Sequence, residues 1–474
     1  MTDYETVIGL EVHVQLGLDS KLFSTAPSAA LGPANTRVHH IDIGLPGVLP
    51  RLNRSAIELA TRAALALGGK VQPYSEFARK HYFYPDQPKG YQISQFDLPL
   101  AFGGSIAIGE QRSCRIHRLH VEEDAGKLTH ADIGTLVDLN RAGVALVEIV
   151  SEPDIKNPKE AHTFLRHLRE AIRFARVSDC DMELGSMRCD ANISLMPSGS
   201  DTFGQKVELK NLNSMKMVQR ALEYEVRRQT TLLRSGGRVV SETRSWRDEL
   251  GESRSMRSKE GTPDYRFLPD PDLPPLLIDE AFVEAQRKQI GELPQQRRAR
   301  YSKSYGLNQQ DIAALTQNRL TGDWFEAVVA AGAAAKFACN WLIEDLLPAL
   351  RNRHLELDKS PITPQKLADL LDLLASKRLT QKTARRVFAH LLSNQVSPEQ
   401  AVMDLGLGRI SDPVEIQPLI DEAITELPQA AQAVANGNDR AIDALKGLVM
   451  RKIQGRADPK VLDSLLRKTI AANS

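Results

Sequence analysis

Two segments far apart in the chain alternate apolar and polar side chains as half-buried β-strands do. In residues 6–15 the predicted polar face carries Glu11, His13 and Gln15, opposite Ile8, Leu10, Val12 and Val14. In residues 188–195 it carries Asp190, Asn192 and Ser194, opposite Cys189, Ala191, Ile193 and Leu195. If the fold lays the two polar faces side by side, they form a platform of carboxylates and imidazole, the starting point of a metal or catalytic site.

The rest of the first 290 residues mixes predicted strands with two predicted helices. Short apolar runs predict strands at residues 114–121, 136–139, 145–150 and 206–212. One helix is predicted to begin after Asn157 as N-cap, with Pro158 at its first position and Glu160 completing a capping box. A second helix is predicted near residues 215–233. Because strands and helices do not alternate strictly, the pattern favours an α+β fold with a mixed or antiparallel sheet.

The pattern changes after residues 268–277, a proline-rich stretch that predicts an extended, stiff connector. From about residue 293 the chain is predicted to be all-helical. Three pairs of a capping residue and a proline predict helix starts, namely Thr363–Pro364, Ser397–Pro398 and Asp458–Pro459. A glycine-containing break near residues 406–408 divides this part. We therefore expect an α+β domain at residues 1–292, a helical domain at 293–405 and a small helical tail domain at 406–474.

Composition narrows the class of protein. The chain has 474 residues, more than one hydrophobic core usually supports, and a formal net charge of +1, so any polyanion has to be bound by local patches. Its four cysteines form no closely spaced pair, which argues against a disulfide framework and fits a reducing cytosol. Residues 1–5 show no signal-peptide pattern and residues 325–335 are too short to span a bilayer, so a cytoplasmic location is expected.

Acidic residues recur next to histidines on the predicted strands. Glu122, Glu123 and Asp124 follow His117 and His120, and Glu148 and Glu152 flank another strand end. Hard divalent cations bind carboxylate oxygens on a rigid framework, and phosphoryl transfer uses such cations to neutralise phosphate charge. His13 favours Mn²⁺ or Zn²⁺ over Mg²⁺, which rarely takes imidazole. Each acidic residue taken alone also fits a solvated sheet face.

Two basic segments suggest contacts with nucleic acid. Residues 79–92 interleave Lys80 and Lys89 with Tyr82 and Tyr84, a combination that suits stacking on an unpaired nucleotide, although a packed aromatic cluster is the alternative. The C-terminal run that includes Lys452, Arg456 and Lys460 is compatible with RNA-backbone binding or with a solvated helix face. The segment around Lys127 does not match a Walker A loop, because Val121 and Leu128 replace the required glycine and hydroxyl residue.

Eight short motifs point to a known family. They are residues 7–13 (VIGLEVH), 82–86 (YFYPD), 91–95 (YQISQ), 122–127 (EEDAGK), 138–141 (DLNR), 148–154 (EIVSEPD), 187–192 (MRCDAN) and 208–214 (ELKNLNS). With them the chain resembles the B subunits of the bacterial aspartyl/glutamyl-tRNA(Asn/Gln) amidotransferases, the GatB family. The resemblance runs from about residue 4 to the C-terminus.

The resemblance implies a cradle-like catalytic domain, a helical domain and a tail related to the YqeY family. It also implies a reaction in which ATP phosphorylates the side-chain carboxylate of Glu-tRNA(Gln), Asp-tRNA(Asn) or both, and ammonia then displaces phosphate. The ammonia would come from a partner amidase (a glutaminase), and a small third subunit would complete a heterotrimer. The implied cofactor is Mg²⁺, with Mn²⁺ as the alternative, and ATP is a substrate.

The family pattern also assigns roles to individual residues. It implies His13, Glu123, Glu148 and Asp190 as metal ligands with Glu11 nearby, and Lys80, Lys89 and Lys127 as the cations beside the transferred phosphate. Tyr82 and Tyr84 would hold the tRNA 3′ end, and Lys452, Arg456 and Lys460 would contact the outer bend of the tRNA. The tail departs from the family pattern at residues 446–450 (KGLVM) and 455–459 (GRADP), where Gly-Gln-Val-Met and Ala-Asn-Pro are expected.

Two other functions remain compatible with the sequence. The chain could be a non-catalytic subunit that presents tRNA to a partner enzyme, in which case removing Glu148 or Asp190 leaves carboxylate activation intact. It could also be a stand-alone metal-dependent hydrolase that is active without tRNA or partners. The number of ligand-type residues and the absence of hydrolase motifs favour the amidotransferase subunit.

Overall fold

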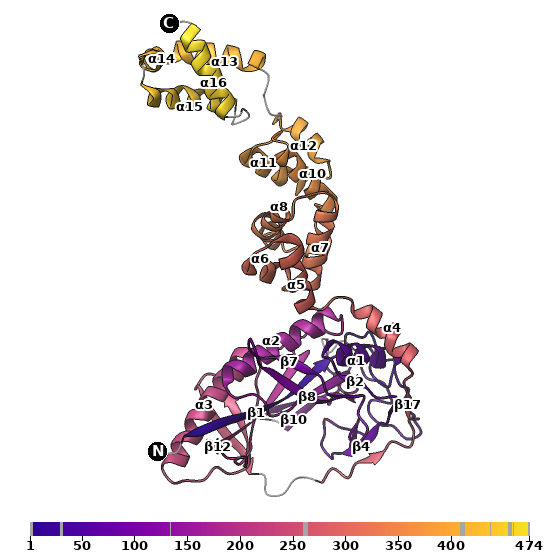
Figure 1. Cartoon of the computed structure of the whole chain (residues 1–474). Helices are drawn as coiled ribbons and strands as arrows, with labels where there is room; N and C mark the ends of the chain where they lie inside the picture. The colour runs from indigo at the N-terminus through magenta and orange to yellow at the C-terminus, as the bar shows by residue number, and fades with distance from the viewer. Residues whose placement is uncertain are drawn as a thin grey trace. The chain divides into compact units, whose positions relative to one another are not determined.

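The computed structural model describes residues 3–28, 32–132, 134–258, 264–407, 413–436, 438–453, 457 and 459–472. The chain divides into two compact units, Met1–Arg297 and Arg298–Ser474 (Figure 1). The first combines a mixed sheet with helices, and the described part of the second is helical. The predicted fold class, an α+β part followed by an all-helical part, is confirmed.

A ten-stranded sheet organises the described part of the first unit, in the order β15-β14-β13-β12-β1-β11-β8-β6-β2 with β7 paired to β8. All its pairs are antiparallel except β13 with β14. Its strands are β1 (Tyr4–Gln15), β2 (Lys70–Val71), β6 (Ala101–Phe102), β7 (Ser105–Ala107), β8 (Ser113–Glu123), β11 (Ala145–Ser151), β12 (Met187–Pro197), β13 (Val207–Lys210), β14 (Glu242–Arg247) and β15 (Glu252–Ser258).

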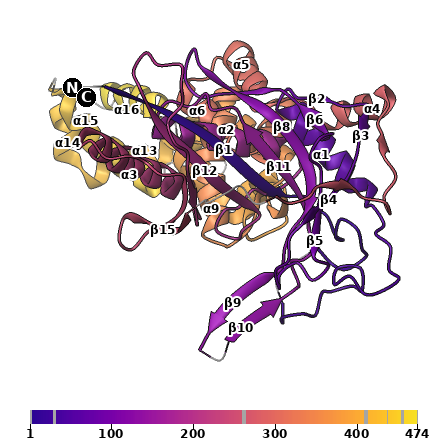
Figure 2. The same cartoon turned by 90° about the horizontal axis from the view of Figure 1, so that it is seen from below.

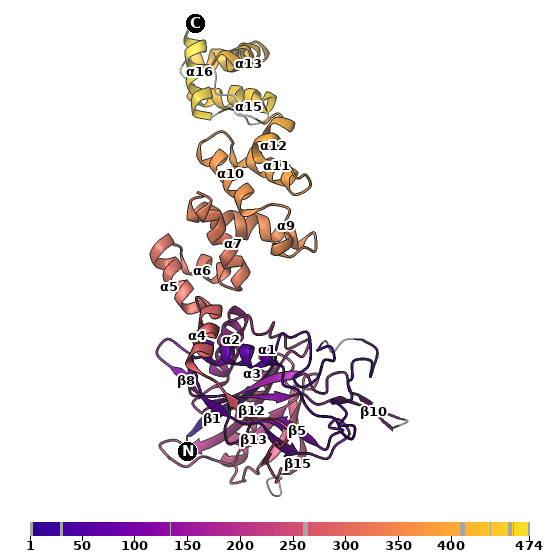
Figure 3. The same cartoon turned by 90° about the vertical axis from the view of Figure 1, so that its right-hand side faces the viewer.

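The alternation of β1 separates a core face from a polar face. Ile8, Leu10, Val12 and Val14 are buried in the hydrophobic core, whereas Glu11 and His13 on the other face are only partly buried. Helices α1 (Arg54–Ala66), α2 (Pro158–Phe174) and α3 (Met215–Arg234) cover the core face (Figure 3). The polar face of the central strands is thereby left for the site.

Helix α2 begins where the sequence predicts. The Asn157 side chain accepts a hydrogen bond from Glu160 N at 3.0 Å, and Pro158 occupies the first turn. The predicted capping box is wrong in its second half, because the Glu160 carboxylate accepts from Lys156 N at 2.9 Å, one residue before the cap. It also pairs with Arg112, the residue just before β8.

The proline-rich stretch predicted as a connector belongs to the first unit instead. It supplies β16 (Leu268–Pro269), which pairs with β4 (Ala78–His81), and β17 (Leu276–Leu277), which pairs with β3 (Tyr74–Ser75). Helix α4 (Glu280–Ile290) follows and adds Ile290 to the core. Strand β5 (Tyr91–Ser94) completes the small sheet beside β4. Strands β9 (Lys127–Ala131) and β10 (Gly134–Asp138) form a hairpin that projects from the unit (Figure 2).

From α5 onward the described chain is helical. Two hydrophobic cores form there, one from Tyr301 to Leu407 and one from Ile416 to Ile470. The helices are α5 (Pro294–Tyr305), α6 (Gln309–Leu315), α7 (Arg319–Ala330), α8 (Ala335–Asn340), the π-helix η1 (Trp341–Leu346), α9 (Leu347–Arg351), η2 (Leu357–Lys359), α10 (Pro364–Ala375), α11 (Gln381–Leu391), α12 (Pro398–Asp404), α13 (Pro413–Glu426), α14 (Pro428–Ala435), η3 (Asp439–Ala441), α15 (Ile442–Lys452) and α16 (Pro459–Ala472).

Two of the three predicted helix starts in this region are confirmed. Thr363 caps α10 and Ser397 caps α12. In each case the side-chain oxygen accepts a hydrogen bond from the backbone N–H of the third helical residue. Asp458 lies outside the described residues. Among those residues, no helix combines the length and apolar character needed to cross a bilayer.

Candidate metal and catalytic site

Four neighbouring strands place their polar residues in one row across the sheet. The register aligns Arg188 on β12 with His13 on β1, His13 with Glu148 on β11, and Glu148 with His120 on β8. Glu11 on β1 lies opposite Asp190 on β12. The structure thus lays the two predicted polar faces side by side and adds β11 and β8 to the platform.

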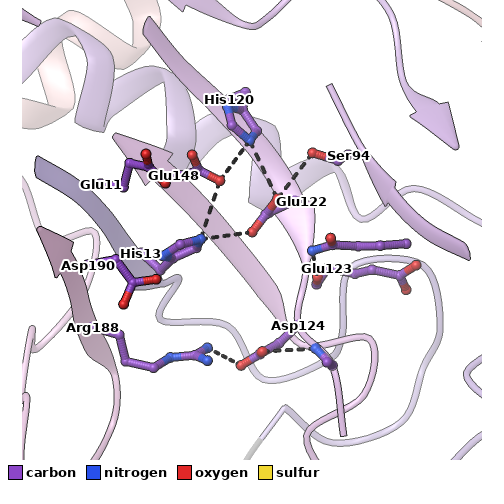
Figure 4. A network of polar contacts seen from close by, with 12 residues as sticks. Glu11, His13, Ser94, His120, Glu122, Glu123, Asp124, Glu148, Arg188 and Asp190 are labelled. Atoms are coloured by element: carbon purple, nitrogen blue, oxygen red, sulfur yellow. Dashed lines mark hydrogen bonds and ion pairs between the residues drawn. The ribbon is translucent and has the colours of Figure 1, made fainter. Parts of the chain in front are cut away.

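Two glutamates lie between two histidines at the centre of this platform (Figure 4). His13 Nε2 lies 3.4 Å from Glu122 Oε1 and 3.3 Å from Glu148 Oε2. His120 Nε2 lies 3.4 Å from Glu122 Oε2 and 3.3 Å from the same Glu148 Oε2. We call these four residues the His–Glu cluster. The Ser94 hydroxyl on β5 donates to Glu122 Oε2 at 3.1 Å.

Mutual pairing compensates for the burial of these charges. Burial lowers the pKa of both imidazoles, but the hydrogen bonds and charges of Glu122 and Glu148 raise the pKa of His13 to about 10 and that of His120 to about 9. Burial raises the pKa of Glu122, but His120 and His13 lower it to about 2. The same histidines hold the pKa of Glu148 well below its ordinary value, against its burial. A cation that binds an imidazole of this cluster therefore has to displace a proton.

The cluster has the donor set of a divalent-metal site. One possible ligand atom from each of His13, Glu122 and Glu148 lies within 4.8 Å of the other two. Two carboxylates and an imidazole suit Mn²⁺ or Zn²⁺ and are less usual for Mg²⁺. The buried Nδ1 atom of His120 has no hydrogen-bond partner among the described residues, but it lies across the ring from Nε2, so a cation held by His13, Glu122 and Glu148 would not contact it. By their donor set, the residues present fit a cation.

Glu122, and not Glu123, faces His13. Successive residues of a strand point to opposite sides, so Glu122 shares the side of His120, two residues away. The Glu123 carboxylate pairs instead with the Lys89 ammonium group and accepts from Ile93 N at 2.9 Å. The geometry therefore does not match the choice of Glu123 as a ligand beside His13. It also ties Lys89, a predicted phosphate-binding residue, to a buried partner.

Asp190 and Glu11 occupy the neighbouring row and have partners of their own. Lys210 Nζ donates to Asp190 Oδ2 at 2.7 Å, and Asn192 Nδ2 donates to Glu11 Oε1 at 2.8 Å. Burial lowers the pKa of Lys210, but Asp190 and Glu208 together raise it above its ordinary value. The group of possible ligand atoms found among the described residues contains neither Asp190 nor Glu11.

A cavity of about 480 Å³ lies against the cluster, with His13 and Glu122 in its lining. Of the three predicted phosphate-binding lysines, Lys80 lines this cavity, with its ammonium nitrogen 4.9 Å from the centre of the Tyr265 ring. Lys127 is exposed on β9. Two further cations, Arg188 and Lys210, line the cavity. The wall thus combines anionic and cationic groups on a scale that suits a small ligand.

The predicted nucleotide-stacking tyrosines lie together, and one of them borders the cavity. The rings of Tyr82 and Tyr84 stack with their centres 5.6 Å apart. Tyr82 lines the cavity, and both rings are exposed to solvent. They are therefore accessible to a flat ligand, as the sequence-based hypothesis requires.

The predicted tRNA-binding residues of the tail have varied surroundings. Lys452 at the end of α15 donates to Glu422 at 2.8 Å and also pairs with Glu426, both on α13. Lys460 is exposed in the first turn of α16. Arg456 lies outside the described residues.

Sequence reasoning left several residues of this site without a role. The sequence pattern marks His120 and Glu122 as polar strand residues without assigning them a role, and Arg188 and Lys210 occur only within motifs. A two-residue spacing links His120 to Glu122 and Arg188 to Asp190, so one strand face carries each pair. That spacing is the signal in the sequence that could have found them.

The geometry described so far is that of an α+β protein with a buried carboxylate–imidazole cluster beside a cation-lined cavity. Two family models match the chain, one described as the GatB/GatE catalytic domain over residues 6–284 and one as the GatB domain over residues 323–470. Together they cover most of its length. The chain belongs to the GatB family, which confirms the resemblance seen in the motifs.

Curated relatives agree along the whole chain. Three of them are named as the B subunit of an aspartyl/glutamyl-tRNA(Asn/Gln) amidotransferase. The protein of Macrococcus caseolyticus is 46% identical over 98% of this chain and 99% of its own length. That of Geobacillus kaustophilus is 47% identical over 99% of each chain. That of Moorella thermoacetica is 44% identical over 99% of this chain and 100% of its own.

Proposed function

We propose that this chain is the subunit of a tRNA-dependent amidotransferase that activates the side-chain carboxylate of Glu-tRNA(Gln), Asp-tRNA(Asn) or both. The carboxylate oxygen attacks the γ-phosphorus of ATP and ADP leaves. Ammonia then attacks the acyl carbon and phosphate leaves, which yields the amide. A partner amidase supplies the ammonia from glutamine, and a small third subunit completes the complex. The names of the relatives support the class of substrate and the existence of partner subunits.

The observation that carries this proposal is the His–Glu cluster in the wall of the cavity. The first step brings two anions together, a carboxylate and a triphosphate, so it needs positive charge at the point of transfer. A divalent cation held by His13, Glu122 and Glu148 would supply that charge to the phosphate oxygens. Glu122 replaces Glu123 in this assignment because its carboxylate faces His13.

Residues around the cavity would orient the two substrates. Lys80, Arg188 and Lys210 line the space beside His13 and suit the phosphate groups of ATP. Arg188 pairs with Asp124 and Lys210 with Asp190, so a phosphate has to compete with these carboxylates. Tyr82 and Tyr84 suit the terminal bases of the tRNA, because stacked and exposed rings bind an unpaired base through its face. Asp190 and Glu11 lie one row further along the sheet, where Lys210 and Asn192 fix their carboxylates.

The tail would contribute affinity for the tRNA backbone through Lys452, Arg456 and Lys460. Backbone contacts of this kind neutralise phosphates and make binding depend on salt. Lys452 is engaged with Glu422 and Glu426, so a tRNA phosphate has to compete with two carboxylates for it.

Amide formation on Glu-tRNA(Gln) tests the proposal, with ammonium chloride, ATP and Mg²⁺ or Mn²⁺ supplied to the chain and its partner subunits. Glu148→Gln keeps the size of the side chain and removes its charge, so we expect activity to fall by about 100-fold or more, with tRNA binding retained. Glu152→Gln is the matched control, because Glu152 pairs with His117 at the end of the same strand, outside the cluster.

The other outcomes identify the competing functions. Undiminished activity of Glu148→Gln would contradict a catalytic cluster and leave a subunit that presents tRNA to its partner. Hydrolytic activity that requires neither tRNA nor partner subunits would indicate a metal-dependent hydrolase.

A further inference from the structure

His13 and His120 approach the same two carboxylates from opposite sides, but their surroundings differ. The His13 side chain is 22% exposed and lines the cavity, whereas the His120 side chain is 4% exposed and lies behind the carboxylates. A cation or substrate that enters through the cavity therefore meets His13 first. His120 has the position of a supporting residue.

The two oxygens of Glu122 face different histidines, whereas one oxygen of Glu148 faces both. Glu122 turns Oε1 toward His13, and its Oε2 faces both His120 at 3.4 Å and the Ser94 hydroxyl at 3.1 Å. Two donors thus hold the oxygen that points away from His13. Glu148 Oε2 is shared between the two imidazoles, at 3.3 Å from each Nε2.

We propose that His120 is a positioning residue that fixes the carboxylates of Glu122 and Glu148 so that they face a cation bound at His13. The inference rests on the proposed metal centre. His120 Nε2 lies 3.4 Å from the Glu122 oxygen that points away from His13 and 3.3 Å from the Glu148 oxygen that also faces His13, and Ser94 donates to the same oxygen of Glu122. Groups that orient metal-binding carboxylates in this way contribute to affinity without touching the metal. His120 reaches these carboxylates because it shares a strand face with Glu122 and is the register partner of Glu148.

The test measures Mn²⁺ binding to the full-length chain with its partner subunits. Electron paramagnetic resonance gives the affinity, and pulsed versions of the experiment count the imidazole nitrogens bound to the metal. His120→Ala is expected to weaken Mn²⁺ binding by about 10- to 100-fold, the usual loss for such a supporting group. His120→Gln keeps an N–H donor near the same place, so its affinity is expected to stay within about threefold of the wild type. In the wild type and in His120→Gln, the spectra are expected to show one imidazole nitrogen, which His13→Ala removes.

Two variants serve as controls. His117 lies on the same strand as His120 but pairs with Glu152, outside the cluster, so His117→Ala should leave Mn²⁺ affinity unchanged. Ser94→Ala removes the second donor to Glu122 Oε2, and it should weaken binding less than His120→Ala does. If His120→Ala does not fold, His120→Gln and Ser94→Ala still carry the test.

Each contrary result has a separate meaning. Two imidazole nitrogens in the wild type, with one lost in His120→Gln, would make His120 a ligand and overturn the inference. Wild-type affinity in a folded His120→Ala, or loss of binding in a folded His120→Gln, would also overturn it while leaving the metal centre in place. A wild type that binds no divalent cation would overturn the metal centre itself, and the inference with it.

Discussion

The His–Glu cluster and the basic tail both gather charged residues, but they hold them in different ways. Glu122 is 3% exposed, and its partners come from β1, from β5 and from its own strand. Lys452 lies on the surface of a helix and pairs with two exposed glutamates of α13. The first arrangement is set by strand register, whereas the second depends on side chains that can rearrange at little cost.

This difference shows which charged groups in a sequence are informative. A buried charge costs free energy unless its partners are fixed, so the cluster can exist only in one geometry. An exposed pair needs no such geometry and tolerates many partners. Charge that two neighbouring strands bury together therefore points to chemistry, while dense charge on a helix surface does not by itself.

The sharpest way to test the comparison is to change the two adjacent glutamates of β8 separately. Glu122→Gln removes a carboxylate that faces His13, so Mn²⁺ affinity is expected to fall by more than about 100-fold, beyond the loss typical of supporting groups. Glu123→Gln removes a carboxylate on the opposite side of the strand, so Mn²⁺ affinity should stay near that of the wild type. Isothermal titration calorimetry with Mn²⁺ measures the affinity of each variant. The reverse pattern would restore Glu123 as the ligand.

Glu123→Gln is expected to act on stability instead. Its carboxylate pairs with Lys89, and the side chains of both are almost fully buried, at 2% and 6% exposed. Removing one partner leaves a buried charge unpaired, which typically costs about 3–5 kcal/mol. Urea unfolding monitored within the first unit measures this loss. Lys89→Met in the Glu123→Gln background should recover much of it, and a double variant as unstable as the single one would contradict the explanation.

The sequence predicts the faces of β1 and β12 but not the neighbours of those strands. Alternation over Ile8–Val14 fixes which side chains of β1 share a face, and the structure confirms it. That β11 and β8 lie next to β1 depends on pairings between segments more than one hundred residues apart, such as His13 with Glu148. No local pattern encodes such long-range pairings, so the whole cluster could not be assembled from the sequence.

The family pattern, and not the local alternation, selects Glu123, because the alternation in β8 does not distinguish Glu122 from Glu123. The register with β11 shifts between Val150 and Ser151, so that Val150 pairs with Arg118 and Ser151 with Ile116. The buried positions consequently change phase, from Cys114 and Ile116 to Leu119 and Val121. A strand whose alternation changes phase does not show which of two adjacent glutamates faces inward.

Helix caps offer a comparison in which the two regions should behave alike. Asn157 in the first unit and Ser397 in the second each accept a backbone N–H of the first helical turn. Replacing either with alanine is expected to cost about 1 kcal/mol, because the cap is a local interaction in both. Hydrogen exchange of the amides of α2 and α12 measures each loss separately. A much larger loss at Asn157 would show that the first unit is fixed by its caps as well as by its strand pairs.

The smallest effect is expected at Lys452. Glu422 and Glu426 occupy its ammonium group, so Lys452→Ala should lower tRNA affinity by less than about threefold and change the dependence on salt by less than one phosphate contact. Replacing both glutamates with glutamine releases Lys452 and should strengthen tRNA binding.

Part of that gain would come simply from removing negative charge near the RNA. The gain therefore has to be compared with the same double replacement in a Lys452→Ala background, where only the general effect of charge remains. A larger gain when Lys452 is present would assign it a phosphate contact that the glutamates restrain. Equal gains would show that Lys452, Glu422 and Glu426 form a solvated surface group with no role in tRNA binding. Such a group would differ from the His–Glu cluster, whose geometry is set by strand register.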